Sequence, residues 1–162
     1  MKFKSLMTMT LAAMAFVVSM SSCSKDDDEP KVPVADQVVG SYTGDEVITI
    51  AGEPETATAT FQFTKAGDAA VDMVIPQSGE GGMMVIPPLT VKNIPLSKVD
   101  DTISGVLLSY KGTVTGSDGS EKEFLISDLA VGFQGKMAVV TYTLKYGKMP
   151  FDMTTFFNGE KK

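Results

Sequence analysis

The stretch Thr56-Ala57-Thr58-Ala59-Thr60-Phe61-Gln62-Phe63-Thr64 decides the fold class of this chain. Two alanines and then Phe61 and Phe63 occupy every second position, and polar side chains occupy the positions between them. Apolar residues that recur with a period of two predict a β-strand with one face in a core. Threonine, which dominates the polar positions, is a poor helix former and packs well on a pleated sheet. Residue propensity therefore agrees with the alternation.

Short turns divide the rest of the chain into similar runs. The clearest turn is Ser117-Asp118-Gly119-Ser120, where Asp-Gly suits the two positive-φ positions of a type I′ turn. We expect it to join a strand over residues 103–114 to a strand over residues 121–130. Other turns are expected at 51–54, 66–68, 134–135 and 146–148, and the remaining strand-like runs are 47–50, 56–64, 71–75, 137–144 and 151–157. From Val38 onward, no apolar positions recur with helical spacing over a helix-length window.

About eight strands joined mostly by tight turns predict an all-β domain with antiparallel neighbours. A sheet of that size protects its two edges by closing into a barrel or by folding into a sandwich. Nearly uniform hairpins favour the barrel, because a sandwich usually needs long crossover connections. The expected fold is therefore an antiparallel up-and-down β-barrel of about eight strands.

The segment over residues 73–95 departs from this regular pattern. Ile-Pro occurs in it three times, at 75–76, 86–87 and 94–95. Because proline has no N–H to donate to a sheet, we expect the strands here to be edge-like, bulged or short.

Residues 1–22 predict an exported protein. Lys2 and Lys4 precede an apolar stretch from Leu6 to Val18, and small residues follow, which is the organisation of a secretory signal peptide. The apolar stretch has 13 residues, fewer than the roughly 20 that a transmembrane helix needs. A signal peptide is therefore favoured over a membrane-spanning helix.

The single cysteine, Cys23, directly follows Ser21 and Ser22. This arrangement resembles the lipobox of bacterial lipoproteins. The resemblance implies that cleavage leaves Cys23 as the first residue, that it is acylated with fatty acids such as palmitate, and that this lipid is the contact with the membrane. Two or more acyl chains anchor a protein durably, whereas one chain does so only marginally.

Acidic residues and prolines follow Cys23, and residues 23–36 are therefore expected to form a lipidated, flexible tether before a barrel domain over residues 37–162. The run that resembles the outer-face export signal of Bacteroides-type lipoproteins consists of Lys25, Asp26, Asp27, Asp28 and Glu29. The resemblance implies an outer-membrane lipoprotein exposed on the cell surface. The alternative is an ordinary solvated charge run, which would leave the protein on the periplasmic face.

The two ends of the expected barrel carry a further resemblance. The opening Val38-Val39-Gly40-Ser41-Tyr42-Thr43-Gly44, the Ile-Pro elements and the closing Phe156-Phe157-Asn158-Gly159 resemble the calycin-like (lipocalin-like) domain of Bacteroides-type surface and outer-membrane lipoproteins. The resemblance covers about residues 36–160. It implies a small antiparallel barrel with a cavity that could hold an apolar molecule.

The composition excludes several kinds of chemistry. The chain has no His and no Arg, and its one Cys is expected to be acylated, so it lacks the residues for a Ser-His-Asp site and the usual donors for zinc or copper. Its net charge of −6 leaves no basic footprint for nucleic acid. We expect no cofactor and no enzymatic activity, and a hydrolase with two paired carboxylates is the remaining catalytic alternative. Asp118, Glu121 and Glu123 cluster at one hairpin, but they do not match the spacing of a calcium loop and are interpreted as turn and exposed strand.

Two groups of apolar residues are candidates for contact with a ligand. Met83 and Met84 follow the glycine-rich Gly79-Glu80-Gly81-Gly82 and would suit an adaptable binding mouth, although methionine is also a routine gap-filler that would pack under the loop. Phe61, Phe63 and Tyr142 are expected in the core first and in a ligand wall second. The leading prediction is a non-catalytic barrel that binds a small apolar molecule or a glycan fragment. The alternative is a structural or interaction module, a filled barrel that docks on another envelope protein.

Overall fold

The computed structural model describes residues 31–79 and 85–162, and its compact unit spans Pro33–Lys162. The predicted signal peptide, Cys23 and the acidic run over residues 25–29 lie outside the described residues, as do Met83 and Met84. Within the described ranges, no helix is long and apolar enough to cross a bilayer.

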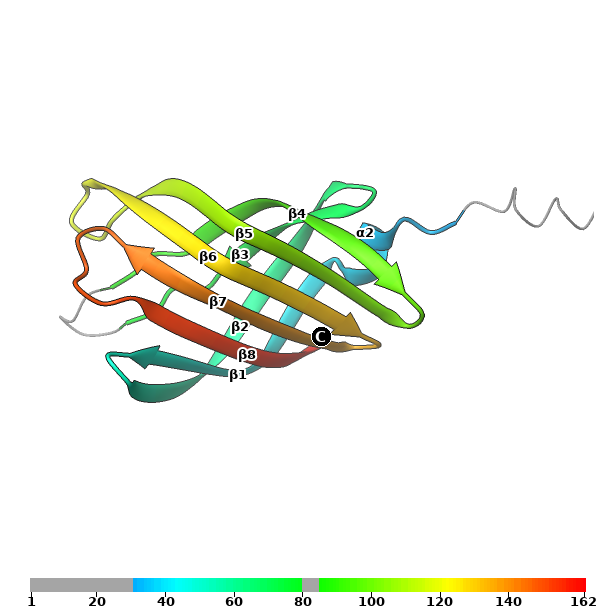
Figure 1. Ribbon diagram of the computed structural model, residues 1–162, viewed down its shortest axis with the longest axis horizontal. Helices are drawn as coiled ribbons and strands as arrows, with labels where there is room; N and C mark the ends of the chain where they lie inside the picture. Colours follow the sequence, from blue (N-terminus) through cyan, green and yellow to red (C-terminus); the bar gives the residue numbers. More distant parts are fainter. Residues whose placement is uncertain (1–30, 80–84) are drawn as a thin grey trace, which may run out of the picture. The chain divides into compact units, whose positions relative to one another are not determined.

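Eight antiparallel strands form a closed barrel in which every strand pairs with its neighbours in sequence and β8 closes on β1 (Figure 1). This arrangement confirms the predicted all-β, up-and-down barrel. The strands are β1 (Gly40–Ile50), β2 (Glu53–Gly67), β3 (Ala70–Ile75), β4 (Leu89–Val99), β5 (Thr102–Thr115), β6 (Glu121–Gln134), β7 (Met137–Tyr146) and β8 (Met153–Lys161).

The barrel has two different ends. One end carries the β2–β3, β4–β5 and β6–β7 turns together with the short helix α2 (Val34–Val38), and we call it the helix end. The other end carries the β1–β2 turn, the β5–β6 turn and the longer β3–β4 and β7–β8 connections, and we call it the pocket end. Figure 1 shows α2 on the right and the β5–β6 and β7–β8 connections on the left.

Along each strand, alternate side chains face the interior of the barrel. These inward-facing side chains are buried most completely toward the helix end. On β2, Phe61 and Phe63 are 0% and 2% exposed, as the period-two pattern predicted. Ala57 has the same phase but is exposed, because β2 pairs only with β1 over its first nine residues, Glu53 to Phe61. The inward-facing side chains of β2 are therefore buried at Phe61 and Phe63, toward the helix end, and exposed at Ala57, toward the β1–β2 turn.

Gly44 allows the barrel to close. It lies opposite Gly159 where β1 pairs with β8. A Cβ atom on Gly44 would collide with the backbone carbonyl of Asn158 on β8. The glycines of the opening and closing motifs therefore let two strands approach closely at the seam of the barrel.

Two bulges opposite each other reverse the facing of β5 and β6 at mid-strand. The buried positions are odd-numbered near the β6–β7 turn, as at Leu129, and even-numbered nearer the pocket end, as at Ile126. Between them lies Asp128, whose φ of 52° marks a bulge. Opposite it on β5, Leu108 falls between paired neighbours and is 77% exposed. On both strands the inward-facing positions change from odd-numbered to even-numbered at the bulge. Because the change occurs on both, the pairing register between β5 and β6 is the same before and after it.

The strand that contains the third Ile-Pro, β4, is bulged, as predicted. In β4 the pairing with β3 slips between Val91 and Ile94, and Asn93 has a φ of 57°. Pro95 marks a change of partner, because β4 pairs with β3 up to this residue and with β5 only from Leu96 onward. The wall between β4 and β5 is consequently short and lies at the helix end.

The β5–β6 hairpin forms where predicted, but the predicted turn type is wrong. Gly119 has a φ of 78°, whereas Asp118 has no positive φ, because a turn from Gly116 to Gly119 precedes the glycine. The arrangement expected for Asp-Gly occurs instead at Ala51–Gly52, where φ is 52° and 85° and Ile50 pairs with Glu53.

The predicted flexible tether is too long at its C-terminal end. Pro33 begins the compact unit, and the helix α2 starts at Val34, inside the range 23–36 that was expected to be coil. Ala35 is fully buried, and its N–H donates to the Asp68 carbonyl at 3.0 Å. Apolar contacts of one turn are enough to order this segment, although five residues are too few to show helical periodicity in the sequence.

Candidate functional site

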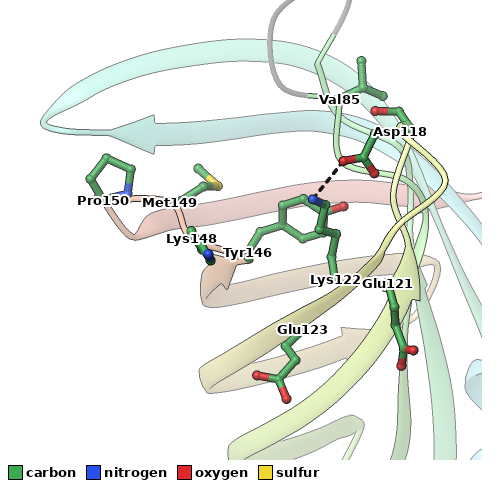
Figure 2. A pocket seen from close by; sticks show the side chains of 11 residues that line it. Val85, Asp118, Glu121, Lys122, Glu123, Tyr146, Lys148, Met149 and Pro150 are labelled. Atoms are coloured by element: carbon green, nitrogen blue, oxygen red, sulfur yellow. Dashed lines mark ion pairs between the residues drawn. The ribbon is translucent and has the colours of Figure 1, made fainter.

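A pocket of about 650 Å³ opens at the pocket end, between the β5–β6 turn and the β7–β8 connection (Figure 2). It combines charged, polar and apolar side chains. Its lining consists of Val85, Ser117, Asp118, Glu121, Lys122, Glu123, Tyr146, Gly147, Lys148, Met149 and Pro150. These residues come from three segments that are far apart in sequence and meet because alternate connections of an up-and-down barrel lie at the same end.

Asp118 fixes one wall of the pocket. Its carboxylate accepts hydrogen bonds from the backbone N–H and the hydroxyl of Ser120, at 3.0 and 2.7 Å, and forms an ion pair with Lys122 at 3.0 Å. The hydrogen bonds from Ser120, and then the one from Lys122, hold the pKa of Asp118 well below its usual value. Asp118 is therefore ionised over the physiological pH range and holds the turn.

The opposite wall is attached to β6 through the backbone. The N–H of Gly147 donates to the carbonyl of Glu123 at 2.8 Å, and the N–H of Met149 donates to the carbonyl of Tyr146 at 3.1 Å. The carboxylate of Glu123 is 3.3 Å from Lys111 of β5. The start of the β7–β8 connection is consequently held beside β6.

Tyr146 is the buried polar group of this pocket. Its side chain faces the barrel interior in phase with Tyr142 and Leu144, and it is 4% exposed. Its hydroxyl has no hydrogen-bond partner among the residues that the structure describes. Burial raises the pKa of Tyr146, so the hydroxyl keeps its proton at neutral pH. A buried, protonated hydroxyl at the wall of a pocket can donate to a bound molecule.

Figure 2 shows the Tyr146 ring beside Lys122, whose ammonium group is joined to Asp118 by the dashed line. Glu121 and Lys148 also line the pocket, and neither forms an ion pair with any residue in the described ranges. Glu121 lies at an odd-numbered, outward-facing position of β6, and its carboxylate points away from Tyr146 (Figure 2), so the pocket itself presents Lys148 and the Tyr146 hydroxyl without a partner among the described residues.

The predicted aromatic ligand wall lies in the packed core. The ring centroid of Phe61 is 4.4 Å from that of Phe157 and 6.5 Å from that of Tyr142. Phe63 lies in a separate group, 4.9 Å from Phe133 and 5.6 Å from Tyr42. The structure thus brings Phe61 and Tyr142 together, and neither they nor Phe63 line the pocket at Tyr146. The proposed contact of Met83 and Met84 with a ligand stays a prediction.

The acidic residues of the β5–β6 hairpin contribute to the lining of the pocket, and two of the three are paired with lysines. Asp118, Glu121 and Glu123 all line it. Asp118 is paired with Lys122 and Glu123 with Lys111. Across residues 31–79 and 85–162, no three His, Cys, Asp or Glu side chains come together in a way that could hold a metal ion.

Glu46 is a buried acid that the sequence reading did not single out. It lies on the inner face of β1, between Ala57 of β2 and Phe157 of β8, and is 5% exposed. Burial raises its pKa to about 7. Of the acidic residues in the described part of the chain, Glu46 alone is buried, so that part contains no pair of buried carboxylates of the kind a glycosidase uses. Its phase with Tyr42 and Gly44 was the signal that could have placed it inside.

The sequence signal for Tyr146 was similar. Tyr146 bounded a predicted turn, and its even-numbered phase with Tyr142 and Leu144 indicated the interior. A second, smaller pocket of about 450 Å³ lies at the helix end. There the Lys98 ammonium donates to the side-chain oxygen of Gln37 at 2.8 Å, so two of its polar side chains are bonded to each other.

These features define a closed, calycin-like antiparallel barrel with a polar pocket at one end. The family model for the calycin-like beta-barrel domain matches residues 38–160, and the chain belongs to this family. No curated protein matches the chain.

Two solved structures are similar. One is described as a "putative outer membrane protein" from Bacteroides fragilis NCTC 9343; it is 18% identical with a TM-score of 0.61, and the match covers 81% of this chain and 54% of that one. The chain thus spans about half the length of the Bacteroides protein. The other is a redesigned beta barrel, 11% identical with a TM-score of 0.43, and the match covers 80% of this chain and 96% of that one.

Proposed function

We propose that this chain is an outer-membrane lipoprotein whose calycin-like barrel binds a small molecule, without catalysis, in the pocket at Tyr146. The Bacteroides outer-membrane structure with the same fold supports the location, as do the signal-peptide and lipobox patterns around Cys23. The acidic run Lys25 to Glu29 supports exposure on the cell surface. The filled aromatic core supports a site at the end of the barrel rather than in its middle.

The Tyr146 hydroxyl is the observation that carries the binding proposal. Leaving a buried hydroxyl without a partner costs about 1–3 kcal/mol. Phenylalanine in this place would avoid that cost and keep the packing. A pocket that retains the hydroxyl beside charged side chains is suited to a ligand that accepts a hydrogen bond.

The test is a fragment screen read by NMR of methyl-labelled methionines in the full-length chain. Met149 lines the pocket, and Met137 at the opposite end of β7 is the internal reference. We expect a subset of fragments to shift Met149 and not Met137, and Tyr146→Phe to weaken those shifts. Fragments that never move Met149, or that move it equally in Tyr146→Phe, would contradict binding at this pocket.

The anchor has its own test. Cys23→Ala is expected to abolish incorporation of labelled palmitate and to release the chain from the membrane fraction. Retention of the label would overturn the lipobox assignment. Neutralising Asp26 to Glu29 is expected to protect the chain from protease added to intact cells, and unchanged cleavage would contradict surface export.

A second candidate, docking on another envelope protein, is favoured by the outer wall. Val106 and Leu108 on β5 are 58% and 77% exposed, and outward-facing Val139 on β7 is 39% exposed. Exposed apolar side chains on a flat strand face can form a protein interface. Capture of one envelope protein by the native chain, abolished by Leu108→Ser and not by Tyr146→Phe, would favour this candidate over the pocket.

A further inference from the structure

The outer wall of the barrel over β5, β6, β7 and β8 is almost free of charge. These four strands lie side by side on one face of the molecule (Figure 1). We call the outward-facing residues of Ser104–Ser109, Ser127–Gly132, Val139–Thr143 and Thr154–Asn158 the β5–β8 face. Its central row runs across all four strands, because Val106, Ala130, Thr141 and Phe156 each pair with the next. Asp128 at the bulge is the only charged residue of this face.

The apolar side chains of the β5–β8 face are open to solvent. On the β5 flank, Leu108 and Val106 are 77% and 58% exposed. Toward the other flank, Val139 and Phe156 are 39% and 47% exposed. Between the flanks, β6 carries only small outward side chains, and a Cβ atom on Gly132 would meet no atom within 4 Å. A contiguous apolar surface of this kind, with space over its middle, is typical of an interaction site.

The distribution of charge favours a second copy of this chain on the β5–β8 face. The chain has a net charge of −6, so two copies repel each other over most of their surfaces. Charged side chains resume in the rows that border the face, with Glu160 on one side and Lys111 and Lys145 on the other. A two-fold contact brings the same patch of both copies together, and this patch contains no repeated like charge.

The position of Asp128 is compatible with such a contact. A two-fold axis between β6 and β7 turns β6 of one copy toward β7 of the other. The Asp128 carboxylates of the two copies then lie on opposite sides of the axis and do not meet. The β5 flank of each copy faces the β8 flank of the other.

The predicted anchor is compatible with the same two-fold axis. The compact unit begins at Pro33, next to α2, so the predicted tether joins the barrel at its helix end. The β5–β8 face lies on the side wall and not at either end. Two barrels that stand side by side with both helix ends toward one bilayer can therefore bring these faces together.

The size of the face suits a weak dimer. Four strands, with about 4.8 Å between neighbours and about 3.3 Å per residue, give a face of roughly 20 Å by 20 Å. Two such faces remove on the order of 1,000 Å² from solvent, at the lower end of specific protein interfaces. Attachment of both copies to one bilayer raises their effective concentration, so a weak contact is enough.

We propose that two copies of this chain pair through the β5–β8 face. Leu108, Val106 and Phe156 are buried in the contact, and the pocket at Tyr146 stays open in both copies. The inference goes beyond the proposed binding function. It also names a second copy, in place of another envelope protein, as the occupant of this outer wall.

The experiment measures the oligomeric state of the mature chain in detergent micelles by sedimentation velocity over a range of concentrations. Val106→Lys adds a charge to the β5–β8 face. Val99→Lys is the matched control, because Val99 is 69% exposed at the end of β4 and lies outside the face. A second pair, Ala130→Lys and Ala130→Glu, changes the middle of the face and is measured separately and as a mixture.

We expect the parent chain to dimerise reversibly. Val106→Lys should weaken the dimer at least about tenfold, since each dimer buries the added charge twice, whereas Val99→Lys should change it less than about twofold. Ala130→Lys and Ala130→Glu should each be monomeric alone, and their mixture should form a mixed dimer because the opposite charges then meet. Thermal unfolding of each variant checks that the barrel is intact.

Three results would overturn the proposal. A parent chain that stays monomeric in micelles and in bilayers would exclude the dimer. A dimer that survives Val106→Lys, or that Val99→Lys weakens equally, would place the contact elsewhere. Capture of an envelope protein by a monomeric chain, lost in Val106→Lys, would assign the face to that protein. Sedimentation does not depend on a ligand or on acylation of Cys23, so failure of the dimer is distinguishable from failure of the proposed function.

Discussion

The two ends of the barrel differ in how their interior-facing tyrosines are used. At the helix end, Tyr42 is fully buried, and its hydroxyl donates to the Val38 carbonyl at 3.0 Å. At the pocket end, Tyr146 is 4% exposed, and its hydroxyl has no partner in the described part of the chain. Both tyrosines are buried, but among the described residues only the hydroxyl at the helix end has a hydrogen-bond partner.

The packing of the interior follows the same division. Tyr42, Phe63 and Phe133 pack ring against ring beneath α2. At the pocket end, Ile48 and Ile50 on the inner face of β1 are only half-buried, whereas ion pairs occur at both ends, with Lys65 pairing with Asp36 and Asp68 at the helix end. Stability is therefore concentrated at the helix end, and surface available for recognition is concentrated at the pocket end.

The largest expected effect tests this division through two phenylalanines. Phe61→Ala removes a fully buried ring from the core and should lower the free energy of unfolding by about 3–5 kcal/mol. Phe151→Ala, at the exposed pocket end, should lower it by less than about 0.5 kcal/mol. Urea denaturation monitored by tyrosine fluorescence measures both, and similar losses would remove the distinction between the ends.

Glu46 lies between the two ends and makes stability depend on pH. Its pKa rises from 4.5 in the unfolded chain to about 7 in the barrel. Because the folded pKa is the higher one, its contribution is complete below pH 4.5 and is lost as the pH rises through 7. The loss amounts to up to about 3 kcal/mol.

Glu46→Gln should remove this component. The variant should be more stable than the parent chain at pH 8 and close to it at pH 4, as measured by urea denaturation at both values. A parent chain whose stability does not fall between pH 4.5 and 7 would contradict burial of the acid.

The two tyrosines give a smaller and more specific comparison. Tyr42→Phe removes a buried hydrogen bond and should cost about 1–2 kcal/mol. Tyr146→Phe removes a hydroxyl that has no partner in the residues described and should be neutral, or stabilising by up to about 1 kcal/mol. Equal losses in thermal and urea unfolding would mean that Tyr146 is satisfied within the protein.

The smallest expected effect concerns the surface ion pair of the pocket end. Lys111 and Glu123 are both mostly exposed, and such pairs contribute about 0–1 kcal/mol. Lys111→Met should therefore leave the midpoint of thermal unfolding nearly unchanged, and the small difference should vanish in 1 M salt. A large, salt-resistant loss would show that the pocket end is stabilised by its charges.

Local pattern predicted most of the fold. The alternation around Phe61 and Phe63 placed β2, and hairpin turns at short intervals predicted the closed eight-stranded barrel. The reversal of facing at Leu108 and Asp128 could not be predicted, because a bulge depends on which residues of two strands pair. The turn type at Asp118 failed for a related reason: Asp118 hydrogen-bonds Ser120 and Lys122, and a five-residue loop replaces the two-residue turn.

The site was less accessible to sequence reasoning. Asp118, Glu121 and Glu123 were identified as a cluster, and they do line one pocket. Tyr146 and Glu46 were not singled out, because their burial, and the lack of a described partner at Tyr146, depend on residues distant in sequence. Phe61 and Tyr142 were assigned to the core first, and their contacts fit that assignment.

The seam between β1 and β8 has a practical consequence for handling the molecule. The chain enters the barrel through α2, and its last residue, Lys162, donates to the Ser41 carbonyl, so entry and exit lie together at the helix end. A fluorescent tag or a solid support attached after Lys162 would thus stand away from Tyr146. Joining Lys162 to Pro33 by a short linker and reopening the chain at Ala51–Gly52 should give a permuted barrel with the same strand pairing.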